Sequence, residues 1–115
     1  MTLAEQLYAV LSPLAAGGAW PLIAAQGTPT PYIVYGDVII TTENSLQGAS
    51  ALQNSRMQID GYQTSYAAMK SLGTAITAAM AAWAVTNVKL SEQVFFEADT
   101  RLYRVSLDYS IWSTS

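Results

Sequence analysis

The sequence predicts an α+β domain in which a four-stranded antiparallel sheet carries two helices on one face. Two stretches place apolar residues three and four positions apart, which is typical of amphipathic helices. Four stretches are rich in β-branched and aromatic residues and form two pairs, each joined like a hairpin. Each pair follows one of the helices, so the expected order is α-β-β-α-β-β. The 115 residues fit a single domain, 1–115.

The first helix is expected to begin at a capping box. Thr2 can accept a hydrogen bond from a first-turn amide, and Glu5 can reach back to the start of the helix. Apolar side chains then recur at helical spacing: Leu3, Leu7, Val10, Leu11 and Leu14. Gly17 and Gly18 are expected to end the helix, because glycine readily adopts the left-handed conformation found there.

The first strand pair follows a stiff, proline-containing stretch that ends at Pro31. Residues 32–42 are rich in β-branched and aromatic side chains and predict a long strand. Residues 43–51 are small and polar and predict a long hairpin loop. The second strand is expected at residues 52–62.

The second helix is predicted to be capped by Thr64 or Ser65. Its apolar stripe comprises Tyr66, Met69, Leu72 or Gly73, Ile76, Met80 and Trp83. A final hairpin is expected, with strands around residues 88–97 and 103–111 and a turn at 98–100. In the first of these strands the apolar set is Val88, Leu90, Val94 and Phe96.

The composition limits the function classes. Hydrophobic residues make up 51% and charged residues only 11% of the chain, against about 25% charged in typical soluble domains. We therefore expect another copy or a partner to cover part of the surface. The net charge is −3 and only five residues are basic, which disfavours a direct grip on nucleic-acid phosphates. Residues 71–88 carry no charge, but their many small side chains predict a buried helix instead of a membrane span.

No catalytic, cofactor-binding or metal-binding residues are predicted, so we expect no enzyme and no cofactor. The chain contains no histidine and no cysteine, which removes the commonest general base and the thiolate nucleophile. Glu97, Asp99 and Asp108 are the best candidates for holding a hard cation such as Mg²⁺. A solvated hairpin tip is the favoured interpretation of these carboxylates, because such residues are common in turns.

Charged and aromatic residues suggest where the chain meets a partner. Arg56 and Asp60 share one face of the second strand and are expected to pair with Asp108 or Arg104 across the sheet. A contact between subunits is the equally weighted alternative. Trp20 and Trp112 are the aromatic residues best suited to anchor an interface.

Four phrases together resemble a known family, and they span the whole chain. They are residues 2–8 (TLAEQLY), 30–35 (TPYIVY), 56–66 (RMQIDGYQTSY) and 103–112 (YRVSLDYSIW). Their order and spacing resemble the tail-completion or tail-terminator family, the head–tail joining proteins of long-tailed phages and prophages.

The resemblance implies a structural virion protein that forms a ring, expected to be a hexamer, at the head-proximal end of the tail tube. The ring would end tube polymerisation and offer a head–tail joining surface. Its expected partners are other copies of itself, the tail-tube protein and the head–neck connector proteins, with DNA only passing through the lumen and no membrane. Its expected location is the tail or neck of the virion, after assembly in the host cytoplasm.

Seven residues form the candidate interface with another subunit or partner: Glu43, Asn44, Leu46, Gln47, Arg56, Trp20 and Trp112. The loop at residues 43–51 is the candidate for reaching a neighbour or projecting toward the lumen, and a free, mobile loop is the alternative. Two other functions stay open: a head–tail adaptor or tail-tube subunit, and a small ligand-binding or regulatory domain.

Overall fold

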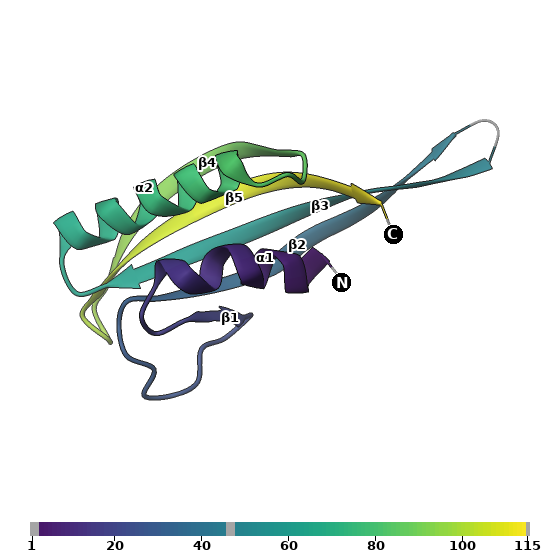
Figure 1. Cartoon of the computed structure of the whole chain (residues 1–115). Helices are drawn as coiled ribbons and strands as arrows, with labels where there is room; N and C mark the ends of the chain where they lie inside the picture. The colour runs from purple at the N-terminus through teal and green to yellow at the C-terminus, as the bar shows by residue number, and fades with distance from the viewer. Residues whose placement is uncertain (1–2, 46–47, 115) are drawn as a thin grey trace.

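A computed structural model describes residues 3–45 and 48–114, with side chains described outside residues 39–53 and 113–114. The chain forms α1 (Leu3–Leu11), a 3-10 turn (Ser12–Leu14), β1 (Ala19–Pro21), β2 (Tyr32–Ser45), β3 (Gly48–Gln63), α2 (Tyr66–Ala82), β4 (Asn87–Glu97) and β5 (Leu102–Thr114). The strands make one sheet in the order β1-β2-β3-β5-β4 (Figure 1). The α+β class and both hairpins are as predicted.

The prediction of a four-stranded, wholly antiparallel sheet is wrong in detail. The sheet has five strands, because β1 pairs in parallel with the start of β2. β1 is only three residues long and ends in a proline, so it is too short to show a period of two. The other four strands pair antiparallel.

The first helix ends earlier than predicted. α1 stops at Leu11, and a 3-10 turn containing Pro13 follows. Proline lacks the N–H that would continue the helical ladder. Gly18 does adopt a positive φ of 83°, but it lies beyond the 3-10 turn. Thr2 of the predicted capping box lies outside the described residues.

The second helix follows the prediction closely. Ser65 caps it, and its side chain accepts a hydrogen bond from the Ala68 amide at 3.2 Å. The predicted stripe is buried at Met69, Leu72, Gly73, Ile76 and Met80. At its two ends, Tyr66 is exposed and Trp83 is only partly buried.

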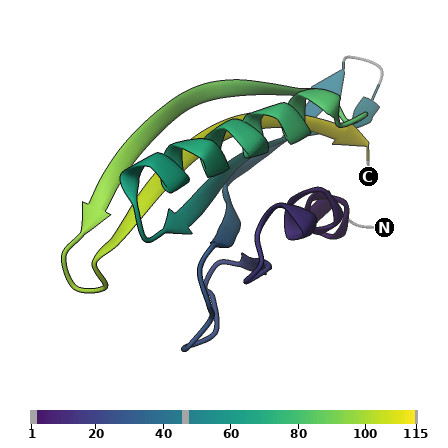
Figure 2. The ribbon, with the colours of Figure 1, turned by 60° about the vertical axis from the view of Figure 1, so that its left-hand side comes forward.

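The core lies between the helices and the sheet face that curves around α2 (Figure 2). Both helices cover this same face, so the opposite face is open. The sheet contributes buried side chains at alternate positions: Ile33, Tyr35, Met57, Ile59, Val105, Leu107, Tyr109 and Ile111. Leu7 and Leu11 of α1 complete the core with the α2 stripe.

β2 and β3 continue beyond the body of the domain as a two-stranded arm (Figure 1). The prediction of a long loop at residues 43–51 is therefore wrong: β2 runs to Ser45 and β3 starts at Gly48. The polar residues pair through their backbones, including Asn44 with Ala49. The radius of gyration is 15.0 Å, compared with about 13 Å for a compact chain of this length.

Candidate assembly surfaces

The open sheet face carries an ion pair between neighbouring strands. Arg56 of β3 donates to the Asp108 carboxylate of β5 at 3.1 Å, and the Ser91 hydroxyl of β4 lies 3.3 Å from the same oxygen. The predicted pairing of Arg56 with Asp108 is thereby confirmed. It does not exclude a further contact of Arg56 with another subunit.

A second charged cluster surrounds Arg104. One guanidinium nitrogen lies 3.4 Å from Asp60, whose residue is only 8% exposed, and Nε lies 3.9 Å from Glu97. The guanidinium also stacks over the Phe95 ring at 4.5 Å from its centroid. The Gln58 amide donates to both oxygens of Asp60 at 3.2 Å. Both arginines of this face thus have carboxylate partners within the chain, which makes the face a poor match for nucleic-acid phosphates.

Stacked tyrosines lie on the open face at the end of β3. The rings of Tyr32 and Tyr62 are 4.7 Å apart and nearly parallel. Burial and, to a smaller extent, the nearby Asp60 charge raise the pKa of Tyr62 to about 12. Burial, with a smaller contribution from Glu97, also raises the pKa of Tyr32. Both phenols therefore stay neutral at physiological pH.

On the helix side of β4, two lysines share one carboxylate. Glu92 lies 2.5 Å from Lys89 and 3.6 Å from Lys70. The hydrogen bond from Lys89 is the main reason that the pKa of Glu92 is lowered. This corner therefore carries one more positive charge than negative.

β4 is an edge strand with an unusual number of exposed apolar side chains. Val88, Leu90, Val94, Phe95 and Phe96 are between 39% and 50% exposed. The register shift between Lys89 and Ser91 turns Val88 onto the open face, while Val94 and Phe96 lie on the helix side. Both faces of this edge therefore carry exposed apolar side chains, which proteins normally avoid on a free edge.

The predicted interface residues lie in three places. Trp20 is half-buried in β1, and its indole N–H donates to the Gly17 carbonyl at 2.9 Å. Trp112 is half-buried on the open face, opposite Asn54 and so near Arg56. Glu43 and Asn44 belong to the β2–β3 arm.

Leu46 and Gln47 lie outside the described residues, and the interface role of all seven residues stays a prediction. Sequence reasoning missed the β4 edge. The alternation of apolar and polar residues in β4 is typical of a strand with one buried face. Phe95 interrupts this alternation, because it is apolar and stands where a polar residue is expected.

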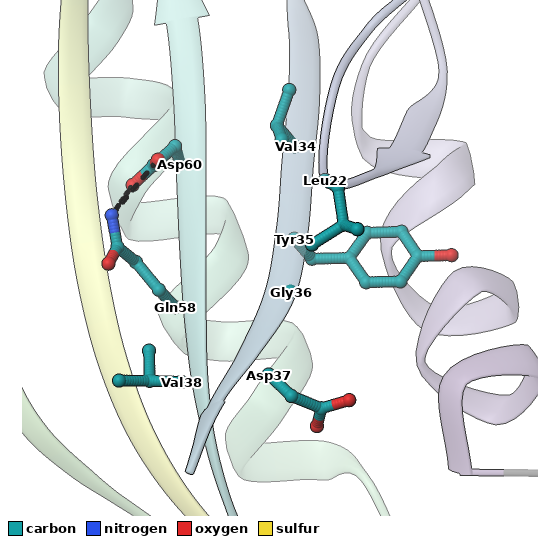
Figure 3. A pocket seen from close by; sticks show the side chains of 8 residues that line it. All are labelled: Leu22, Val34, Tyr35, Gly36, Asp37, Val38, Gln58 and Asp60. Carbon is teal, nitrogen blue, oxygen red and sulfur yellow. Dashed lines mark hydrogen bonds between the residues drawn. The ribbon is translucent and has the colours of Figure 1, made fainter.

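Two of the hollows among the described residues bear on the question of a ligand site. One lies over Gly36, beside Leu22 and Asp60, and has a volume of about 170 Å³ (Figure 3). The other, of about 540 Å³, lies between α1 and the sheet edge and is lined by Ala4, Glu5, Tyr8, Ala9, Pro21 and Tyr35. Small-molecule sites usually combine an apolar pocket with several converging polar groups. The smaller hollow, with its mixed lining, is too small for such a site, and the larger one is mainly apolar and lacks the converging polar groups.

Among the side chains that the structure describes, no three acidic groups lie together so that they could hold a metal ion. Glu97 lies near Arg104, and Asp108 pairs with Arg56. No helix in the described part of the chain is long and apolar enough to cross a membrane.

Comparisons with known proteins give one family and two solved structures with a similar fold. The family model described as tail completion protein gp17 matches residues 5–114. Two solved structures share the fold, each at 18% identity over 97% of this chain. A chain of the virion of a native gene transfer agent particle is covered to 91% with a TM-score of 0.60. The gp17 protein of bacteriophage SPP1 is covered to 86% with a TM-score of 0.54.

A search of curated protein sequences gives no significant match. The family model alone spans nearly the whole chain, and the tail-completion resemblance of the sequence is confirmed. The chain belongs to the tail completion protein gp17 family, which makes it a structural protein of the phage tail and virion and not an enzyme.

Proposed function

We propose that the chain assembles as a closed ring, a hexamer, on the head-proximal end of the phage tail tube. The ring ends tube polymerisation and offers its other side to the head–neck connector proteins. The observation that carries this proposal is the exposed apolar edge strand β4 in a chain of the tail completion family. Such an edge would favour association in solution unless a partner covers it.

A ring needs two different surfaces on each subunit, because neighbours meet head to tail. The sheet supplies such surfaces at its opposite edges, β4 at one and the β2 side at the other. The β2–β3 arm reaches away from the body and extends the span of the subunit. Trp20, Arg56 and Trp112 are proposed to contribute to contacts with neighbouring subunits or with the tube.

Passage of DNA through the ring agrees with the charge of the chain. Its net charge is −3, and Arg56 and Arg104 are paired with carboxylates on the open sheet face. A lumen lined by such surfaces would not hold the phosphate backbone. A tail-tube subunit would instead polymerise into an open-ended tube.

A capping assay tests the proposed role. Tail-tube protein of the same phage is polymerised with and without the purified chain, and tube lengths and the position of gold-labelled chain are recorded by electron microscopy. We expect shorter tubes labelled at one end only, because a closed ring blocks further addition. Unchanged lengths without label, or label along the whole tube, would exclude a terminator. Tubes with added bovine serum albumin serve as the control.

A further inference from the structure

Two edges of the sheet lack a complete strand partner within the described part of the chain: β4, and the outer side of β2 beyond β1. We propose that β4 of one copy pairs antiparallel with the outer edge of β2 in the next copy, beginning at Gly36. This inference rests on the proposed ring. One continuous sheet would then run from subunit to subunit. The occupant of each free edge is thus a second copy of this chain.

The outer edge of β2 is only partly covered. β1 pairs with Ile33, Val34 and Tyr35, and the Leu22 amide then donates to the Tyr35 carbonyl at 2.8 Å. Beyond Tyr35, no described strand pairs with the outer side of β2. Ten residues, Gly36–Ser45, therefore present an unpaired edge.

Backbone alternation shows which groups of β4 face outward. The Tyr35 carbonyl points away from β3, so its partner Ile59 must bond to Leu107 of β5. The backbone N–H and C=O groups of Leu107 therefore point away from β4. The backbone groups of Glu92, which lies opposite Leu107 on β4, point to the free edge. The same alternation turns the N–H and C=O groups of Val94 and Phe96 toward the free edge.

Strand direction and length also match. β2 and β5 run antiparallel to β3, and β4 runs antiparallel to β5. A neighbour in the same orientation therefore brings its β4 antiparallel to β2, which is the more stable pairing. β4 has 11 residues, against ten on the free part of β2.

Side-chain chemistry agrees with this pairing when the strand ends are aligned. Val38, which is 51% exposed, comes beside Phe95 of the neighbour on the open face.

Cross-linking tests which edges meet, because the chain has no cysteine of its own. The double variant Val38→Cys/Gln93→Cys is treated with a bis-maleimide spanning less than about 10 Å. Within one chain the two strands are three strand spacings apart, about 14 Å, so intramolecular cross-links are disfavoured. We expect a ladder of dimers, trimers and higher species up to the closed ring.

The single variants Val38→Cys and Gln93→Cys should give no ladder, because each contact pairs one β2 with one β4. The variant Ala78→Cys/Gln93→Cys, with one cysteine on the exposed side of α2, is the matched control and should also give none. A ladder in either single variant, or an equal ladder in the control, would overturn the proposed pairing.

Proline at Val94 tests the backbone contact. It removes an outward N–H but no bond to β5, so the fold should persist by circular dichroism. We expect Val94→Pro to lose the oligomer, while Val94→Thr keeps it. The inference is overturned if Val94→Pro still forms the ring and the double variant Val38→Cys/Gln93→Cys gives no ladder. The proposed function would stand in that case. A wild-type chain that stays monomeric would overturn both.

Discussion

Replacing Gly17 by alanine is expected to lower the free energy of unfolding by roughly 3 kcal/mol, the upper range for overpacking. A Cβ at this position would stand 2.0 Å from the Pro29 carbonyl oxygen and 2.7 Å from that of Pro31. These are backbone atoms, and the Gly17 amide already donates to the Pro31 carbonyl at 2.7 Å. The segment that leads into β2 would have to move away. Urea denaturation followed by circular dichroism measures the loss.

Gly27→Ala is the matched control for this prediction. Gly27 has a positive φ of 84°, and nothing lies within 4 Å of the added Cβ. Only backbone strain should result, which costs about 1 kcal/mol. Equal losses in the two variants would show that the close approach at Gly17 contributes nothing.

Replacing Arg104 by alanine is expected to cost about 2 kcal/mol. The change leaves the carboxylate of Asp60 nearly buried and without its cation, which costs about 3–5 kcal/mol in fully buried pairs. The partial exposure of Arg104 reduces the effect. Thermal and urea denaturation measure the loss of stability.

A double-mutant cycle isolates the pair. The variant Asp60→Ala/Arg104→Ala should be more stable than the sum of the single losses implies, because no unpaired charge remains. Strictly additive losses would mean that Arg104 stabilises the sheet only through its packing on Phe95.

Much of the fold could be predicted because its signals are local and long. The α2 stripe of Met69, Ile76 and Met80 follows helical spacing, and Ser65 precedes it as a cap. In β5 the buried residues alternate with polar ones from Val105 to Ile111. Such patterns determine an element and its buried face together.

The errors have physical causes. β1 is held by pairing with β2, which is distant in sequence, so no local pattern reveals it. The small polar residues of the arm form strands because a backbone ladder does not depend on side-chain polarity. Pro13 ended α1 inside an apolar periodicity that continued to Leu14.

The candidate surfaces could be predicted only in part. The pairing of Arg56 with Asp108 follows from the alternation of two neighbouring strands. The exposure of Val94 and Phe96 depends on β4 being the last strand of the sheet. Strand order is a property of the whole chain, so a pattern within β4 cannot distinguish a central strand from an edge.

The mass of the purified chain in solution tests ring assembly most directly. Light scattering behind a sizing column is recorded over a wide range of protein concentrations. We expect one discrete species close to six times the chain mass of 12.3 kDa, unchanged as concentration rises, because a closed ring leaves no free edge. A strict monomer at every concentration, or a mass that grows without limit, would contradict a self-closing ring.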